Sequence, residues 1–458
     1  MMRIAMIGTG YVGLVSGVCF SEFGFDVTCV DKDAAKIEAL NRGEVPIYEP
    51  GLSELMVKNA ARLTFSTDLA VAVEEADVVF IAVGTPSRRG DGEADLSYVY
   101  AAAREVAAAM RPGTIVVIKS TVVVGTTREV KRIIAEAAPD KDFSIAANPE
   151  FLREGAAIED FLRPDRVIVG VEDERGEQAL KTLYRPLNLR QTPIVFTSLE
   201  NAEIIKYAAN AFLAMKITFI NEIADLCEAA GGNVQDIARG IGLDNRIGAK
   251  FLHPGPGYGG SCFPKDTRAF AALARRLGSP VKLIETTISL NETRIASMAE
   301  RVVAAMGGSV EGRTIAILGI AFKPNTDDVR EAPALTLIPA LQAAGASIRA
   351  HDPEARESAA PILSSLTWCA SPYEAAEGAD ALVIMTEWNE YRALNLTKLS
   401  ELMRGNVVVD LRNIYPLEEI APHRFDYHSL GRPDALRPRH SDGFAPAPPR
   451  QVGGTGQA

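Results

Sequence analysis

The chain of 458 residues is long enough for two or three domains, and its 47% apolar and 23% charged residues are typical of a globular protein. The net charge of −11, without any block of lysine or arginine, argues against a nucleic-acid or membrane-surface ligand. Five scattered cysteines argue against a disulfide framework, and the lack of a signal peptide or long apolar run predicts a cytoplasmic protein.

The N-terminus predicts a dinucleotide-binding unit. An apolar strand over 4–7 is followed by Gly8-Thr9-Gly10-Tyr11-Val12-Gly13, a helix, and a strand over 26–30 that ends in Asp31. In this order the glycines allow a tight turn, close approach of a pyrophosphate, and packing of the helix on the strand. The Asp31 carboxylate would bind the ribose and repel a 2′-phosphate, which favours NAD over NADP. Lys36 would reach the ribose or phosphates, or is an ordinary solvated helix residue.

Three further apolar runs, over 77–83, 114–119 and 143–148, predict buried strands of a parallel sheet separated by helices. Ligands bind at the carboxyl ends of the strands in such sheets. Each run ends in a polar cluster, and four residues of these clusters are site candidates by position: Thr85, Thr121, Glu150 and Glu154. An ordinary turn explains either glutamate, taken alone, about as well.

A proline-free stretch over 199–231 predicts one long helix, of a length that suits a connection between two domains or two subunits. Lys206 and Asn210 are four residues apart and therefore lie on the same face. Pointing into a cleft, they would supply two donors for a developing oxyanion; a solvated lysine beside a tolerated asparagine is the alternative. His253 is typical of a loop residue, and no His, Cys, Asp and Glu cluster has metal-ligand spacing.

A glycine- and proline-rich loop over 255–260 leads to Cys262, and a helix is predicted over 265–277. A thiol just before a helix is expected to have a lowered pKa because of the helix dipole. The glycines are expected to let a ligand approach the backbone closely. These features favour a reactive nucleophile over a structural cysteine.

The C-terminal part predicts a second α/β unit, with strands over 312–322, 347–352, 381–385 and 407–410. It lacks the glycine triplet, so it is Rossmann-like without the NAD signal. Polar clusters follow its strands, and their cations suit a phosphorylated ligand or are ordinary surface charge: Lys323, Arg330 and Arg412. From residue 433 onward the composition predicts a disordered tail.

An NAD fingerprint and a reactive thiol in one chain indicate one chemistry. An alcohol is oxidised to an aldehyde, the thiolate adds to it, and a second hydride transfer gives a thioester that water hydrolyses to an acid. An enzyme that performs only the first step does not need the cysteine. A two-domain NAD-binding sensor without turnover is a different alternative, and the helix-start cysteine argues against it.

Four motifs together resemble the nucleotide-sugar dehydrogenase family, which acts on UDP-glucose or GDP-mannose. They lie at 8–13, 148–155, 259–266 and 319–330. The resemblance covers residues 1 to about 432 and implies two Rossmann-like domains with parallel sheets joined by a long central helix. The implied domains are 1–198 for NAD, 199–300 for the central helices and the cysteine loop, and 301–432 for the UDP-sugar, followed by the tail 433–458.

The activity that the resemblance implies is the four-electron oxidation of UDP-glucose to UDP-glucuronate with two NAD⁺ and one water. Another nucleotide sugar such as GDP-mannose is the alternative substrate. Six catalytic residues are implied: Cys262, Lys206, Asn210, Asp266, Thr121 and Glu150. The cysteine would be the nucleophile, and the lysine and asparagine would stabilise the oxyanion. The aspartate would act through a water that the threonine helps to order, and the glutamate would be the base for thioester hydrolysis.

The implied NAD contacts are Gly8, Gly10, Tyr11, Val12, Gly13, Asp31, Lys36, Thr85, Thr121, Glu154, Lys265 and Arg330. The implied substrate contacts are Phe151, Leu152, Arg153, Glu154, Lys206, Asn210, Arg246, Phe251, Leu252, His253, Pro254, Gly255, Gly259, Lys323 and Arg412. Arg246 would reach across an interface in a homodimer or larger homo-oligomer. His253 stands where some relatives carry lysine, so its contact would be through the backbone.

Overall fold

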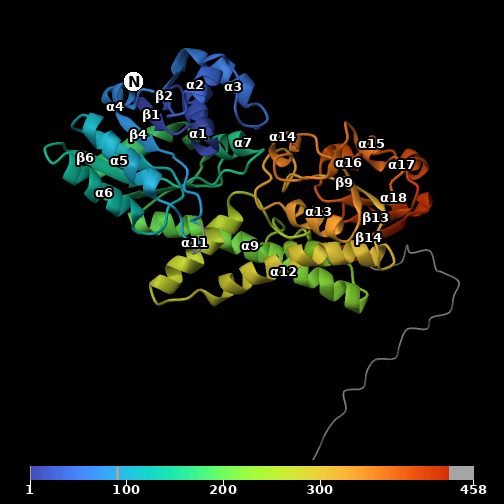
Figure 1. Ribbon diagram of the computed structural model, residues 1–458. Coiled ribbons are helices and arrows are strands. Elements are labelled where there is room, and N and C mark those ends of the chain that lie inside the picture. Colours follow the sequence, from blue (N-terminus) through green and yellow to red (C-terminus); the bar gives the residue numbers. More distant parts are fainter. Residues whose placement is uncertain (1, 89–91, 433–458) are drawn as a thin grey trace, which may run out of the picture.

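The chain folds into two α/β units above a group of long helices (Figure 1). The computed structural model describes residues 2–88 and 92–432, and the tail predicted over 433–458 lies outside them. The predicted architecture of two Rossmann-like units joined by a long central helix is confirmed. Within the described ranges, no helix combines the length and the apolar character that a membrane crossing needs.

The first unit is built on an eight-stranded sheet with the order β3-β2-β1-β4-β5-β6-β7-β8. The strands are β1 (Arg3–Ile7), β2 (Asp26–Val30), β3 (Leu63–Ser66), β4 (Val78–Ile81), β5 (Thr114–Ile118), β6 (Phe143–Ala147), β7 (Val167–Val171) and β8 (Ile194–Thr197). The predicted parallel sheet is confirmed for β1 to β6, whereas β7 pairs antiparallel to β6 and parallel to β8.

Helices cover both faces of this sheet, which is why β4 and β5 are buried along their whole length. These helices are α1 (Tyr11–Glu22), α2 (Ala34–Asn41), α3 (Leu52–Lys58), α4 (Leu69–Glu75), α5 (Ser97–Ala109), α6 (Thr126–Ala137), α7 (Ala157–Leu162) and α8 (Glu174–Leu183), with 3-10 turns at Ala60–Arg62 and Arg185–Arg190. Because β1, β4, β5 and β6 are consecutive neighbours, the segments that follow them meet at one edge of the sheet.

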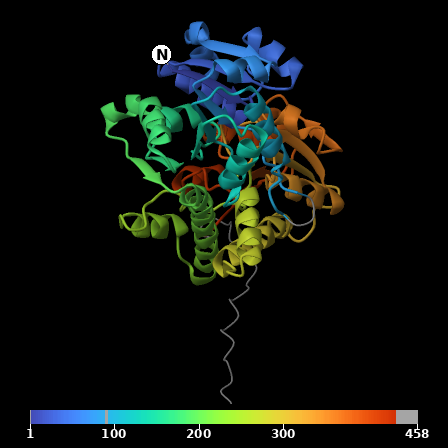
Figure 2. The ribbon, with the colours of Figure 1, turned by 90° about the vertical axis from the view of Figure 1, so that its left-hand side faces the viewer.

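The middle of the chain forms α9 (Leu199–Ala230), α10 (Val234–Gly242), α11 (Phe263–Arg276) and α12 (Lys282–Ala305). Helix α9 matches the long helix predicted from the sequence, and α11 and α12 pack against it beneath both α/β units (Figures 1 and 2). Helix α11 begins at Phe263, two residues before its predicted start, so Cys262 is its N-cap residue.

The second unit is a six-stranded parallel sheet with the order β11-β10-β9-β12-β13-β14. Its strands are β9 (Thr314–Leu318), β10 (Ser347–His351), β11 (Leu366–Trp368), β12 (Ala381–Ile384), β13 (Val407–Asp410) and β14 (Asp426–Ser429). Its helices are α13 (Ala334–Ala343), α14 (Arg356–Ala359), α15 (Pro372–Ala376), α16 (Asn389–Arg392), α17 (Leu396–Leu402) and α18 (Leu417–Ile420), with a 3-10 turn at Ala421–His423.

Asp352 follows β10 and takes the place that Asp31 has after β2 in the first unit. It accepts hydrogen bonds from the backbone N–H groups of Ile320 (2.6 Å) and Ala321 (2.9 Å) and from Trp388 Nε1 (3.3 Å). Because Asp352 is buried among these donors, it has no free face for a ribose. The buried Asp352 and the missing glycine triplet both indicate that the second unit does not bind NAD as the first unit is predicted to.

Candidate active site

The loop after β1 has the shape that a dinucleotide phosphate requires. Gly8 adopts a φ of 103°, and a Cβ on Gly13 would lie 1.9 Å from the Gly8 carbonyl oxygen, so α1 packs directly on the loop. A Cβ on Gly10 would meet nothing within 4 Å among the described residues, which leaves this backbone open to a ligand. No described side chain caps the N-terminus of α1, so its backbone N–H groups can bind an anion.

Asp31 faces this loop from the end of β2. Its Oδ2 accepts hydrogen bonds from the Thr9 backbone N–H (2.9 Å) and Thr9 Oγ1 (2.7 Å), and it lies 3.5 Å from Lys36 Nζ. Burial opposes ionisation, but the hydrogen bonds and the Lys36 charge outweigh it and hold the pKa of Asp31 below its ordinary value. The site therefore carries a fixed negative charge where a ribose would bind, which fits NAD.

Glu150, which follows β6, forms a buried ion pair with Lys206 of α9. The Oε1–Nζ distance is 3.0 Å, and the side chains are only 5% and 4% exposed. Glu150 Oε2 also accepts the Leu152 backbone N–H at 2.5 Å, and Lys206 Nζ lies 5.2 Å from the centre of the Phe151 ring. Burial by itself would lower the pKa of Lys206, but the charges of Glu150, Cys262 and Asp266 together with the Glu150 hydrogen bond outweigh it and raise that pKa. Lys206 is therefore a charged donor.

Asn210 lies one turn after Lys206 and binds a second buried carboxylate. Its Nδ2 donates to Asp266 Oδ2 at 2.6 Å, and Lys265 Nζ donates to Asp266 Oδ1 at 2.6 Å. Lys206, Asn210 and Asp266 are all buried, so the shared helix face predicted for the first two is confirmed. Each of the two oxyanion donors suggested by the sequence is thus matched to its own carboxylate.

Cys262 lies close enough to these groups to feel their charges. The sequence predicted a lowered pKa for this thiol, and that prediction is wrong: burial raises the pKa of Cys262 to about 11, with Glu150 adding to the rise and Lys206 opposing it. Its Sγ lies 3.5 Å from Ser261 Oγ. Position at a helix start does not compensate for removal from water. The resting thiol is protonated, so its proton must leave as the sulfur attacks.

Glu154 joins three parts of the chain at this point. Its carboxylate accepts hydrogen bonds from Ser261 Oγ in the cysteine loop (2.9 Å) and from Thr326 Oγ1 in the second unit (3.2 Å). Arg330 lies 3.4 Å from the same carboxylate. Burial raises the pKa of Glu154 to about 7, Asp328 adds to the rise, and Arg330 opposes it.

Gly155, the next residue, connects this junction to the glycine loop. Its backbone N–H is 2.8 Å from Tyr11 Oη on α1. Through Glu154 and Gly155, the predicted NAD site and the Cys262 loop are held by two successive residues of one segment. One segment of the chain therefore contacts both the glycine loop and the cysteine loop.

The second α/β unit fills the space beside the glycines of the cysteine loop. A Cβ on Gly259 would lie 2.2 Å from the Glu331 carbonyl oxygen, and one on Gly260 would lie 2.7 Å from the Phe322 ring. At these two glycines the protein itself packs closely against the side on which a Cβ would lie. A Cβ on Gly255 would lie 3.1 Å from an Arg412 nitrogen, so the second unit supplies a cation at this loop.

The remaining predicted residues differ in their burial and in their partners. Lys323 is half-buried near Glu154; burial lowers its pKa and Glu154 opposes the change. Thr85 Oγ1 donates to the Thr121 carbonyl oxygen at 2.9 Å, which joins the loops after β4 and β5. Arg246 is not part of the cluster, since its side chain is 89% exposed and paired with Asp244.

The other substrate-loop residues have mixed surroundings. Leu252 packs in a small apolar cluster with α9, Pro254 is buried, and His253 is exposed. Arg153 is half-exposed and pairs with Asp160 at 2.6 Å.

Sequence reasoning missed two buried glutamates that hold the loops of the site. Glu49 accepts the backbone N–H groups of Gly155 (2.7 Å) and Ala157 (2.8 Å), and it also binds the Tyr11 hydroxyl. Glu203 of α9 accepts the backbone N–H groups of Gly125 (2.7 Å) and Thr127 (2.8 Å). Neither residue belongs to a motif, and only the fold brings each to its loop.

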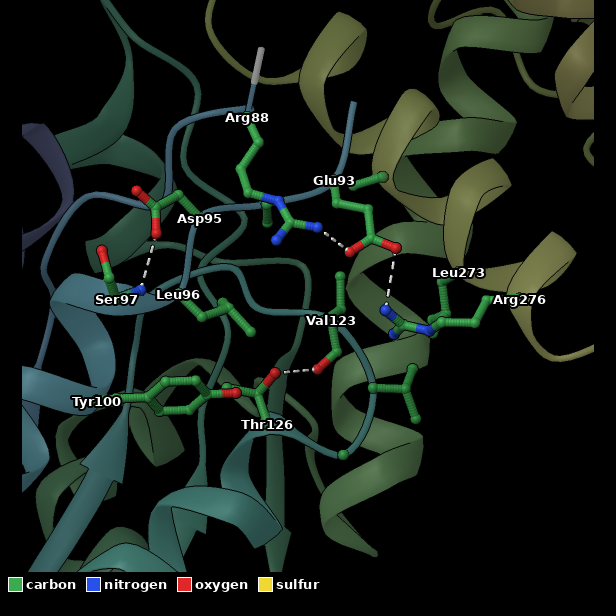
Figure 3. A pocket seen from close by; sticks show the side chains of 14 residues that line it. Arg88, Glu93, Asp95, Leu96, Ser97, Tyr100, Val123, Thr126, Leu273 and Arg276 are labelled. Carbon is green, nitrogen blue, oxygen red and sulfur yellow. Dashed lines mark hydrogen bonds and ion pairs between the residues drawn. The ribbon is translucent and has the colours of Figure 1, made fainter. Parts of the chain in front are cut away.

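The largest described cavity lies outside the Cys262 cluster, which consists of Cys262, Lys206, Asn210, Glu150 and Asp266. It has a volume of about 520 Å³ between the segment 93–97, the loop before α6 and helix α11 (Figure 3). Glu93 pairs there with Arg88 and, at 3.0 Å, with Arg276. None of the residues predicted for the site is among its described lining residues, so we assign the chemistry to the Cys262 cluster.

Comparison with known proteins agrees with this geometry. Models of the UDP-glucose/GDP-mannose dehydrogenase family match three stretches: the NAD binding domain over 2–188, the central domain over 200–293 and the UDP binding domain over 316–416. A UDP-glucose 6-dehydrogenase of Rhizobium meliloti is 60% identical, over 94% of this chain and 100% of its own. One from Bacillus subtilis is 47% identical, over 98% and 97%.

Among solved structures, a UDP-glucose dehydrogenase from Pyrobaculum islandicum aligns with a TM-score of 0.86 and 39% identity, covering 93% of this chain and 97% of its own. A UDP-D-ManNAc dehydrogenase from Pyrococcus horikoshii aligns with a TM-score of 0.82 and 29% identity, covering 94% and 99%.

Proposed function

The chain belongs to the UDP-glucose/GDP-mannose dehydrogenase family, and from this premise we propose that it oxidises UDP-glucose to UDP-glucuronate with two NAD⁺ and one water. The observation that carries the proposal is the junction at Glu154 and Gly155. Glu154 binds Ser261 of the cysteine loop, and Gly155 binds Tyr11 of the proposed NAD loop. A single dehydrogenation would need only the second of these loops.

In the first oxidation, the C6 hydroxyl of the sugar loses a hydride and a proton. NAD, when bound, accepts the hydride. Asp266 takes the proton through a water that Thr121 helps to order. Lys206 and Asn210 donate hydrogen bonds to the C6 oxygen as negative charge develops on it, which their burial makes effective.

In the second oxidation, Cys262 Sγ bonds to the aldehyde carbon while the thiol proton passes to the aldehyde oxygen, which gives a thiohemiacetal. A second NAD⁺, when bound, would accept the hydride from this carbon, and the hydroxyl proton passes to water, which gives the thioester. Glu150 then takes a proton from the water that attacks the thioester carbonyl. The C–S bond breaks, the sulfur regains a proton, and the acid is released.

Substrate binding is shared between the two units. We assign the sugar and its phosphates to the segment 151–154, the loop 251–255 and Gly259, with Lys323 and Arg412 as the cations of the second unit. Arg412 supports this assignment, since it lies beside Gly255 and its charge faces the loop. NAD takes the glycine loop with Asp31 and Lys36, and we add Val12, Lys265 and Arg330 at its phosphate and nicotinamide ends.

A substrate panel with NADH readout tests the proposal. UDP-glucose should give two NADH per molecule and UDP-glucuronate as product. One NADH or none from UDP-glucose would contradict it, and two NADH from GDP-mannose in its place would establish the alternative. The acetamido sugar UDP-ManNAc belongs in the panel because the Pyrococcus relative bears that name.

We further propose a homodimer formed along α9. The exposed face of this helix carries an apolar stripe with Ile204 at 39%, Phe212 at 57%, Phe219 at 47% and Leu226 at 60% exposure. The last three are seven residues apart, the spacing at which two helices pack side by side. Lys216 of α9 binds the Ile247 and Gly248 carbonyl oxygens, so the Arg246 loop adjoins this stripe. A second copy of the chain is the occupant that brings Arg246 to a substrate site.

All five cysteines are free thiols, which is typical of proteins in reducing compartments. This feature supports a cytoplasmic enzyme.

A further inference from the structure

Helix α12 is bonded to the cysteine loop through the side chain of Asn291. Its Oδ1 accepts the Tyr258 backbone N–H at 2.8 Å, and its Nδ2 donates to the Tyr258 carbonyl oxygen at 3.0 Å. Asn291 is buried, so both bonds form away from water. One amide group thus satisfies both backbone polar groups of a residue four positions before Cys262.

A second pair of hydrogen bonds holds the loop three residues earlier, at Gly255. Gly255 donates its backbone N–H to Asn221 Oδ1 of α9 at 2.8 Å, and its carbonyl oxygen accepts from Arg294 Nε at 2.7 Å. Asn291 and Arg294 are three residues apart and lie on the same face of α12. Arg294 is itself held by Asp225 of α9 at 3.0 Å.

The backbone between Gly255 and Tyr258 has little conformational freedom. Gly257 adopts a φ of 120°, and a Cβ there would lie 2.5 Å from the Ile295 side chain and 3.0 Å from Asn291 Oδ1. The loop is irregular, and buried backbone groups outside helices and strands need side-chain partners. The position of Cys262 against Lys206 therefore depends on α12 as well as on α9.

We propose that Asn291 and Arg294 are positioning residues that place the Cys262 loop for attack on the substrate. Asn291 fixes Tyr258, and Arg294 together with Asn221 fixes Gly255. The catalytic consequence rests on the proposed function. The placement of the thiol is independent of the proposed function, and alkylation of Cys262 measures it separately.

The first test is alkylation of Cys262 by iodoacetamide at pH 8, mapped by mass spectrometry, in Asn291→Leu. Leucine fills the site but bonds neither Tyr258 group, so the loop moves and the thiol becomes more hydrated. Its pKa then falls from about 11 towards its ordinary value, and each unit gives about tenfold more thiolate. Alkylation should rise about tenfold while turnover falls, and Glu300→Gln, on the exposed side of α12, should match the parent.

The four buried cysteines distinguish this effect from general loosening: Cys19, Cys29, Cys227 and Cys369. Their alkylation should stay slow in Asn291→Leu. An unchanged Cys262 rate, or an equal acceleration of all five thiols, overturns the proposal. If UDP-glucose is not a substrate at all, the proposed function fails while this measurement still decides the placement.

Asn291→Asp provides a test with a pH signature. A protonated aspartate can replace both amide bonds, whereas an ionised one places a negative oxygen against the Tyr258 carbonyl. Activity relative to the parent should therefore fall as pH rises from 6 to 9, and a pH-independent ratio overturns the assignment. The charged groups that face this position are Arg268, Glu292 and Glu331 on one side and Glu222, Asp225, Arg294 and Arg301 on the other. They are present in the parent as well, so the parent measured over the same pH range controls for their own titration.

Arg294→Lys tests the hydrogen bond from Arg294 to the Gly255 carbonyl oxygen. Lysine keeps a positive charge opposite Asp225 but loses the Nε–H donor to Gly255. Because Gly255 lies both in the proposed substrate segment and in the Cys262 loop, the KM for the sugar nucleotide should rise about tenfold and kcat should fall as well, since the thiol is misplaced. A KM equal to that of the parent in a folded variant overturns the role assigned to Arg294.

Discussion

Glu150 Oε1 and Lys206 Nζ lie 3.0 Å apart, both almost fully buried, and they shift the pKa of Cys262 in opposite directions. The carboxylate raises the pKa of the thiol and the ammonium lowers it. Burial is the main reason that the proposed nucleophile is protonated at rest, and the pair holds a charged donor beside it.

Replacing Glu150 by Gln should lower the pKa of Cys262, because it removes the negative charge and leaves Lys206 unpaired. Iodoacetamide should then alkylate Cys262 about tenfold faster at pH 8. Acid formation should fall about 100-fold or more, since the proposed base for thioester hydrolysis is lost. Rapid quenching and mass spectrometry should find the enzyme-bound thioester. Slower alkylation than in the parent would contradict the charge assignment, and Glu159→Gln on the exposed side of the same segment serves as the control.

Cys262→Ser should abolish UDP-glucuronate formation while NAD affinity changes by less than about twofold. The thiol has no role in cofactor binding, and a serine hydroxyl is a far weaker nucleophile. NAD binding by fluorescence titration and product analysis measure the two effects. Full activity in this variant would remove the thioester mechanism.

Glu154→Gln should change the pH dependence of stability. The pKa of Glu154 is raised from 4.5 to about 7, so this carboxyl stabilises the fold fully below pH 4.5 and the contribution is lost as pH rises through about 7. The free energy of unfolding of the variant, relative to the parent, should therefore rise by about 3 kcal/mol between pH 4.5 and 8. Urea unfolding across this range checks it. A constant difference would show that folding leaves the pKa of Glu154 unshifted, and a difference that falls with pH would show that folding lowers it.

Asp31→Asn should weaken NAD binding about tenfold and narrow the preference for NAD over NADP. The carboxylate accepts hydrogen bonds better than an amide and repels a 2′-phosphate. Steady-state KM values for both cofactors measure this. An unchanged ratio of the two would place the ribose elsewhere.

Phe212→Glu together with Phe219→Glu should convert the proposed homodimer to a monomer, because two charges would be buried in a helix-helix contact. Light scattering after size-exclusion chromatography gives the mass. Ile362→Glu is a matched control, since Ile362 is 58% exposed in the second unit, away from α9. A parent protein that is already monomeric would rule out the interface.

Much of the fold was determined by local sequence pattern. The glycine triplet and Asp31 specified the first βαβ element because only a tight turn and an open backbone accept a phosphate, and the structure keeps Gly10 open. The proline-free run over 199–231 specified α9, since 3.6-residue periodicity needs no tertiary information. The antiparallel join of β7 to β6 was not visible, because strand direction depends on how a chain returns to a sheet.

The site followed the same division. Spacing along one helix placed Lys206 and Asn210 on one face, but only the fold gave them Glu150 and Asp266 as partners, from segments 56 residues away in each case. Burial, which reversed the expected pKa shift of Cys262, is a property of the packed molecule and has no local sequence signal. The grip of Asn291 on Tyr258 belongs to the same class, because hydrogen bonds between distant segments form only where tertiary packing brings them together.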